Sequence, residues 1–187
     1  MGFRSPRVGQ VFTLGAILAL GYCSRSSMPM SPTTSGTTSA GLIGPRIGLL
    51  VGAGDIGFCG PSNVSGSEAT GHLLDHLGGT IFTTGDNAYP NGSAEDYARC
   101  YEPGWGRHVG RTRPAPGNHE YMSGAAPYFG YFGTNAGSNA GGYYSYQVGA
   151  WHVISLNSEI AASAGSAQLE WLRADLASNP STCTAAY

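Results

Sequence analysis

Three short segments combine glycine with residues whose side chains could bind a metal ion. They read Gly54-Asp55-Ile56-Gly57, Gly85-Asp86-Asn87-Ala88-Tyr89 and Gly117-Asn118-His119-Glu120. Two carboxylates, a phenol, an amide and an imidazole in one crevice would cost free energy unless a cation offset them. Their hard oxygen donors favour Fe, Mn, Mg or Zn over an ion that prefers thiolates. These residue types predict a metal site, provided that the fold brings the segments together.

Each of these segments follows a predicted β-strand. The predicted strands are 47–53, 80–84 and 112–115, and helices are expected at 65–77 and 93–101. The spacings Ser65 to Glu68 and Ser93 to Asp96 are typical of helix-capping residues. In an open α/β sheet the carboxyl ends of the parallel strands share one edge, where ligands bind. We therefore expect the three segments to converge at that edge.

The rest of the chain continues the alternation of strands and helices. The expected elements are a hairpin of 143–148 and 151–156, a helix at 167–177 and a strand that begins at Cys183. The predicted apolar helix faces are Ala69, Leu73 and Leu77 in the first helix and Leu169, Leu172 and Leu176 in the last. This order of elements predicts an α/β fold.

Each candidate ligand also has an ordinary structural interpretation. An Asp that follows glycine at the end of a strand usually belongs to a turn or a helix cap. Tyr89 could be a packed aromatic, Gly117-Asn118 an ordinary turn and His119 a surface histidine. His72 and His76 stand four residues apart on the first helix, and we expect them to be solvated side chains. The common position at strand ends favours the metal site.

Taken together, the three segments resemble the first three motifs of the calcineurin-like metallophosphoesterases, in particular the branch that is similar to purple acid phosphatases. That branch has Gly where its relatives have a metal-binding His in the first motif, and it adds a Tyr in the second. Gly57 and Tyr89 match both features. The resemblance covers roughly residues 47–187. It implies a metallophosphoesterase-type four-layer α/β/β/α sandwich that is incomplete, with the first sheet and part of the second.

The resemblance also implies a dinuclear metal centre that hydrolyses phosphate esters, in phosphorylated small molecules or other esters. Asp55 and Tyr89 would bind one metal ion, Asn118 would bind the second, and the Asp86 carboxylate would bridge the two. The expected ions are Fe beside the Tyr, with Zn, Fe or Mn as its partner. His119 would act near the leaving oxygen as a general acid or as a donor that orients the phosphate, with Glu120 holding its ring.

One feature of the family pattern is missing from this sequence. The family completes its site with three histidines from two later motifs, whereas His152 alone follows His119 here and fits neither motif. We therefore expect the chain to be the N-terminal part of a longer phosphatase. As it stands, it should bind metal weakly and hydrolyse little substrate.

Two other functions are compatible with parts of the sequence. Gly52-Ala53-Gly54-Asp55-Ile56-Gly57 satisfies the dinucleotide fingerprint of an oxidoreductase. However, a coil containing Pro61 follows where a helix should start, and Asp55 would repel the pyrophosphate. A secreted carbohydrate- or peptide-binding module is the second alternative. It would use aromatic residues that we expect to be packed instead, namely Tyr128, Phe129, Tyr131, Phe132, Tyr143, Tyr144 and Tyr146.

Composition and the N-terminal segment bound the location and the partners. A basic start and an apolar run at 11–20 predict a signal peptide over 1–22, and 23–46 is expected to be a flexible Ser/Thr/Pro/Gly linker. The metallophosphoesterase part is then 47–187. Export to the medium or the cell envelope follows, and lipidation of Cys23 would provide a membrane tether. Charged residues make up 11% of the chain, which argues against a nucleic-acid partner.

Cysteine spacing and position leave one internal disulfide open. Cys59 with Cys100 is a conceivable pair in an exported chain. Cys59 and Cys183 are expected at opposite edges of the fold and should not meet. The oligomeric state is left open by the sequence.

Overall fold

The computed structural model describes residues 17–19, 48–59, 65–138, 141–179 and 183–187. The first sheet has the order β1-β2-β3-β4, with β1 (Ile17–Ala19), β2 (Leu50–Ala53), β3 (Thr80–Thr84) and β4 (Thr112–Ala115). The strands β2, β3 and β4 are parallel, and β1 pairs antiparallel with β2. The three predicted parallel strands are therefore neighbours, and their carboxyl ends share one edge of the sheet.

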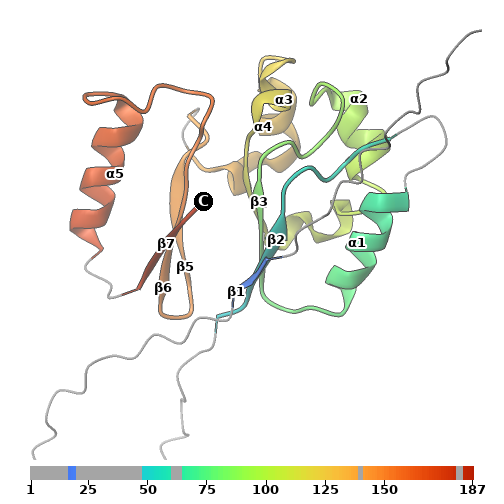
Figure 1. Cartoon of the computed structure of the whole chain (residues 1–187), viewed down its shortest axis with the longest axis horizontal. Helices are drawn as coiled ribbons and strands as arrows, with labels where there is room; N and C mark the ends of the chain where they lie inside the picture. The colour runs from blue at the N-terminus through green and yellow to red at the C-terminus, as the bar shows by residue number, and fades with distance from the viewer. Residues whose placement is uncertain (1–16, 20–47, 60–64, 139–140, 180–182) are drawn as a thin grey trace, which may run out of the picture.

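The second sheet is smaller and is built from the later part of the chain. Its strands β5 (Tyr144–Val148) and β6 (Trp151–Ser155) form an antiparallel hairpin, and β7 (Thr184–Ala186) runs parallel to β6. The hairpin turns at Gly149, whose φ of 62° is readily adopted by glycine. The helix α5 (Ala167–Ser178) covers this sheet (Figure 1). Its Asp175 attaches it to the hairpin by accepting hydrogen bonds from Ser145 and His152.

The two sheets face each other between outer helices (Figure 1). α5 lies on one side, and α1 (Ser65–Asp75) and α2 (Ala94–Asp96) lie on the other. Between the sheets, the Tyr144 hydroxyl donates to the Pro114 carbonyl at 2.8 Å, and the Tyr187 ring lies 5.1 Å from that of Phe82. The fold is thus mixed α/β, with a first sheet and part of a second, consistent with a partial metallophosphoesterase-type four-layer sandwich.

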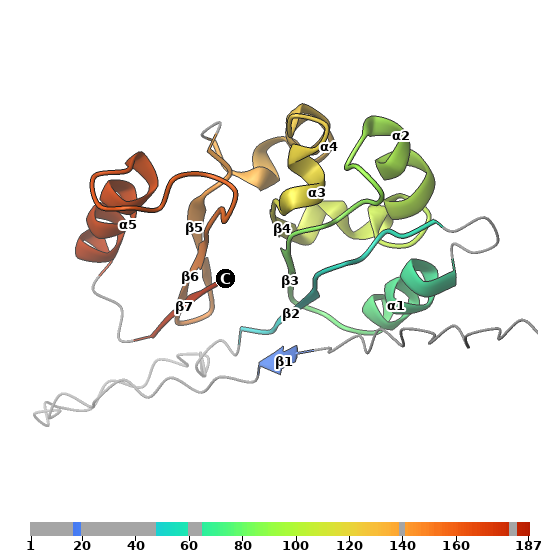
Figure 2. The same ribbon diagram turned by 45° about the horizontal axis from the view of Figure 1, so that its top comes forward.

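The short helices gather at the edge of the first sheet where its parallel strands end. Figure 2 shows α2, α3 (Asn118–Tyr121) and α4 (Ala126–Phe132) along this edge, above β3 and β4. A π-helical turn at Tyr97–Tyr101 continues α2, and 3-10 helices occupy Gly106–Arg111 and Gly133–Ala136. Among the described residues, no helix combines the length and the apolar character that a membrane span requires.

The predicted apolar faces of the two longer helices were partly wrong. Ala69 is exposed and Leu73 is 62% exposed, whereas Ser67, Gly71 and Leu74 are buried. The helix α1 approaches the backbone so closely that a Cβ on Gly71 would lie 2.3 Å from the Gly104 carbonyl oxygen. Ser67 and Gly71 therefore share its inner face with Leu74.

A similar correction applies to α5. Its buried residue is Gln168, while the predicted core residue Leu176 is 43% exposed. The side chain of Gln168 accepts a hydrogen bond from the Asn157 N–H and donates one to the Asn157 carbonyl. Hydrogen bonding thus decides which side of α5 faces the sheet, and a count of apolar residues cannot detect this.

Aromatic side chains fill much of the core beside the first sheet. Tyr97, Tyr101, Tyr128 and Phe132 are buried, and their rings meet in edge-on pairs at centroid distances of 5.3–5.8 Å. Such pairs stabilise a core beyond the area that they bury. The burial of Tyr128 and Phe132 confirms that they pack and removes them from any aromatic binding platform.

Candidate metal centre

The first two segments are held together by backbone hydrogen bonds beyond the ends of β2 and β3. The Ile56 N–H donates to the Asp86 carbonyl at 3.1 Å, and the Gly57 N–H donates to the Asn87 carbonyl at 2.9 Å. The Tyr89 N–H returns a bond to the Gly57 carbonyl at 2.9 Å. This short parallel bridge continues the strand pairing and brings the Asp55 loop against the Asp86–Tyr89 loop.

Three of the four predicted metal ligands are in direct contact. The Tyr89 hydroxyl donates to Asp55 Oδ1 in a short hydrogen bond and lies 3.2 Å from Asp86 Oδ2. Partial burial, the hydrogen bond to Asp55 and the negative charge of Asp86 raise the pKa of Tyr89 well above its usual value. The phenol proton thus reduces the repulsion between the Asp55 and Asp86 carboxylates, which both contact the Tyr89 hydroxyl. A hard cation fits the same oxygen donors and would replace that proton.

Both carboxylates stand on unusual backbone conformations. Asp55 has a φ of 54° and Asp86 has a φ of 52°, in the left-handed region that favours glycine. Each follows a glycine directly after its strand, so the two loops leave the sheet in a similar way. Such conformations cost about 1 kcal/mol or more for residues other than glycine, and they concentrate at functional sites.

The third segment closes on the second through Gly117. A Cβ at Gly117 would lie 2.3 Å from Asp86 Oδ1, so only glycine fits there. The His119 N–H, in the first turn of α3, donates to the same Asp86 oxygen at 3.1 Å. Asn118 is exposed beside it. Within the described part of the chain, no hydrogen bond joins the Asn118 side chain to Asp55, Asp86 or Tyr89. Asn118 therefore lies next to these three residues without a hydrogen bond to them.

His119 is held by a partner that the sequence did not predict. Its ring Nδ1 lies 2.5 Å from the Pro90 carbonyl oxygen, and the ring packs 4.3 Å from that of Tyr89. A carbonyl only accepts, so Nδ1 carries the proton and Nε2 remains available for other contacts. The expectation that Glu120 holds the His119 ring was wrong, because the Glu120 carboxylate binds backbone N–H groups instead.

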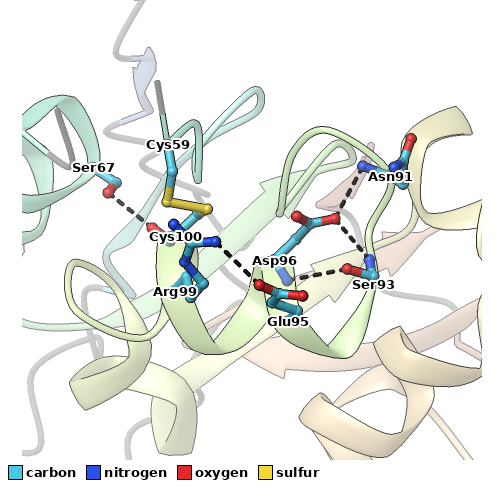
Figure 3. Close-up of a disulfide and its surroundings, with 8 residues drawn as sticks. All are labelled: Cys59, Ser67, Asn91, Ser93, Glu95, Asp96, Arg99 and Cys100. Carbon is cyan, nitrogen blue, oxygen red and sulfur yellow. Dashed lines mark hydrogen bonds and ion pairs between the residues drawn. A yellow bond between two sulfur atoms is a disulfide. The ribbon is translucent and has the colours of Figure 1, made fainter. Parts of the chain in front are cut away.

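A disulfide fixes the first loop to the helical layer. Cys59 is bonded to Cys100 in the π-helical turn, as Figure 3 shows, which confirms that pairing. In the same view, Asp96 accepts from the N–H groups of Asn91 and Ser93 and completes the predicted capping box with Ser93. The loops on both sides of the candidate centre are therefore attached to the same helical segment, 94–101.

The remaining histidines lie away from the centre. His72 is exposed and contacts Asp75, which also pairs with Arg107 at 2.7 Å. His152 is buried between the second sheet and α5, where its Nε2 lies 2.5 Å from Asp175. Among the described residues, no group of three His, Cys, Asp or Glu side chains is arranged to hold a metal ion. Of the four predicted ligands, Asp55 and Asp86 are of these types, and the other two, Tyr89 and Asn118, are further oxygen donors.

The geometry of the first loop argues against the dinucleotide alternative. The third glycine of the fingerprint, Gly57, pairs with the Asn87–Tyr89 backbone instead of starting a helix. The helix α1 begins only at Ser65. A pyrophosphate in such a motif binds at a helix N-terminus that directly follows the glycines, and that helix is absent from the described residues 54–59.

Comparison with known proteins supports the fold. No protein-family model matches this sequence, and no curated protein sequence matches it significantly. A solved structure with a similar fold is purple acid phosphatase PPD1 from seeds of yellow lupin (Lupinus luteus), with a TM-score of 0.52 and 23% sequence identity. The similar region covers 69% of this chain and 27% of the lupin chain. The described fold is therefore similar to part of a purple acid phosphatase.

Proposed function

We propose that the protein belongs to a metal-dependent phosphoester hydrolase of the purple-acid-phosphatase type. The observation that carries this proposal is the contact between Asp55, Asp86 and Tyr89 at the ends of two parallel strands. The left-handed backbone at both aspartates supports a functional role for them. The fold similarity to a purple acid phosphatase supports the class of reaction.

Four side chains would hold the metal ions. Asp55 and Tyr89 would bind an iron ion, Asn118 would bind a Zn, Fe or Mn ion, and Asp86 would be the ligand shared by both. When bound, such ions supply Lewis acidity to a phosphate ester and lower the pKa of water. The donor set is all oxygen, which suits these ions but leaves few anionic ligands, so we expect weak binding by this chain and little hydrolysis.

The hydrogen bond to Pro90 determines which ring nitrogen of His119 carries a proton. Since Nδ1–H donates to the Pro90 carbonyl, Nε2 is the atom that exchanges a proton with a substrate. A neutral ring can only accept at Nε2, whereas the doubly protonated ring can donate there. His119 would therefore act as a general acid for the leaving oxygen only as the imidazolium form.

We also propose that the chain works outside the cytoplasm. The Cys59–Cys100 disulfide supports an oxidising compartment. The signal peptide, the linker and the tether at Cys23 fall outside the described residues, apart from β1 within 1–22. The substrate that we propose is a phosphorylated small molecule or another phosphate ester.

The proposed function is tested by metal titration of three variants. Calorimetry with Mn²⁺ and Zn²⁺ should show weak binding that is lost in Asp86→Asn. Glu95→Gln is the matched control, because Glu95 is an exposed carboxylate that pairs only with Arg99 among the described contacts. Fe³⁺ should give a phenolate charge-transfer colour that Tyr89→Phe removes. Equal binding by wild type and Asp86→Asn would contradict the proposal, and two tightly held ions would contradict the expected weakness.

A further inference from the structure

Glu120 is a fully buried carboxylate beside the candidate centre, and its relative exposure is 0%. Burying a carboxylate costs free energy unless hydrogen bonds replace its hydration. Here Oε1 accepts from the N–H groups of Asn87 at 2.8 Å and Ala88 at 3.3 Å, and from the Tyr97 hydroxyl at 3.2 Å. Its Oε2 accepts from the N–H groups of Asp86 at 3.0 Å and Gly117 at 2.8 Å.

These donors come from two different loops. Asp86, Asn87 and Ala88 belong to the loop after β3, whereas Gly117 belongs to the loop after β4. Neither loop can form strand hydrogen bonds to the other at this point, because both have left the sheet. Oε2 joins them directly, since it accepts one N–H from each loop, and the Asn87 side-chain amide adds a hydrogen bond to the Ala115 carbonyl at the end of β4.

The contact between Asp86 and α3 is reciprocal. The backbone N–H of Asp86 donates to Glu120, while the side chain of Asp86 accepts the N–H of His119. The first bond holds the residue in its left-handed conformation, and the second directs its carboxylate. Both ends of the predicted bridging ligand are therefore fixed by neighbouring residues of one helical turn.

We propose that Glu120 is a positioning residue of the candidate metal centre. Its carboxylate accepts hydrogen bonds from the loops after β3 and β4, joins the two loops and thereby holds Asp86 in place to bind metal. This rests on the function proposed above. Glu120 itself would not touch the metal or the substrate, because both of its oxygens are occupied by backbone and phenol donors. Its effect reaches the centre through Asp86, and through the first turn of α3 that carries Asn118 and His119.

The test uses Glu120→Gln, which keeps the size of the side chain but replaces one acceptor with a donor. The amide nitrogen should face the position with fewer donors, that of Oε2, where it opposes the N–H groups of Asp86 and Gly117. In metal-free protein, hydrogen exchange at these two amides should rise about tenfold or more. Metal affinity should fall roughly 10- to 100-fold, as for other groups that orient metal ligands.

The matched control is Gln168→Ala in the second sheet. Gln168 is also buried, and the substitution removes two side-chain hydrogen bonds to Asn157. Its stability loss should be comparable, but metal affinity and exchange at Asp86 and Gly117 should stay at the wild-type level. A purely structural role for Glu120 predicts the opposite, namely equal metal affinity in the two variants once both are folded.

Two outcomes separate this proposal from the proposed function. Wild-type protein without metal affinity would overturn the proposed function. The exchange data would still test whether Glu120 holds the two loops together. Unchanged exchange at Asp86 and Gly117 in Glu120→Gln would overturn the present proposal. If the variant fails to fold, hydrogen exchange in the wild-type protein is the test. The hydrogen bonds to Glu120 predict slow exchange at these two amides, although they lie outside helices and strands. Exchange at the rate of a solvated loop would refute it.

Discussion

Removal of the Cys59–Cys100 disulfide gives the clearest quantitative test of how the first loop is held. The two cysteines are separated by 41 residues, so the bond closes a long loop in the unfolded chain. Loop-closure entropy for that length corresponds to about 4 kcal/mol of stability at 25 °C. The variant Cys59→Ala with Cys100→Ala should therefore unfold with about 4 kcal/mol less free energy than wild type.

Urea denaturation followed by tryptophan fluorescence measures this loss, since Trp105 is buried. The experiment needs no reductant, because both thiols are replaced. Ser67→Ala is the local control: it removes the hydrogen bond from the Ser67 hydroxyl to the Cys100 carbonyl and leaves the disulfide intact. That single bond should be worth about 1 kcal/mol.

The result that would refute the reasoning is a double-alanine variant no less stable than Ser67→Ala. The disulfide would then add little beyond the packing around Cys100. At low urea the variant should remain folded and keep its metal affinity. Three backbone hydrogen bonds hold the loop independently of the disulfide, namely Ile56–Asp86, Gly57–Asn87 and Tyr89–Gly57.

Two further predictions concern α1. Leu74→Ala should lower the free energy of unfolding by about 2–5 kcal/mol, whereas Leu73→Ala should change it by less than about 0.5 kcal/mol, because only Leu74 is buried; similar losses in urea denaturation would contradict the described packing. Hydrogen bonds from Arg107 hold the pKa of Asp75 well below its usual value of 3.8, so this contribution is present at neutral pH and is lost as pH falls through the lowered pKa. Asp75→Asn should therefore be less stable than wild type at neutral pH, with a gap that shrinks below about pH 4; a gap that stays constant in acid would count against this.

The strands of the first sheet were predictable because their signals are local. The runs 80–84 and 112–115 coincide with β3 and β4. The first is a short β-branched and aromatic segment that glycine bounds, and the second leads into the turn Pro116-Gly117. The position of the three polar segments then followed from a general property of parallel sheets. In the structure, Asp55, Asp86 and Tyr89 are in contact at this edge. Metal binding itself stays a prediction.

Errors arose where two surfaces had to be matched. The sequence pattern placed Leu73 and Leu176 in the core, but both are exposed. On α1, Gly71 lets the helix approach the Gly104 backbone, so that Gly71 and Leu74 face inward and Leu73 faces out. On α5, hydrogen bonds of Gln168 and Asp175 select the inner face. Apolar periodicity records neither close backbone approach nor hydrogen-bonding partners.

The sequence by itself determined the order of the longer elements and the Gly-Asp and Gly-Asn segments at the strand ends. Only the tertiary structure decided what Glu120 and His119 bind. Glu120 meets N–H groups from a loop 32–34 residues away, and His119 meets the Pro90 carbonyl. The physical reason is that backbone N–H and carbonyl groups are the same at every residue, so the sequence does not reveal which of them a side chain will find.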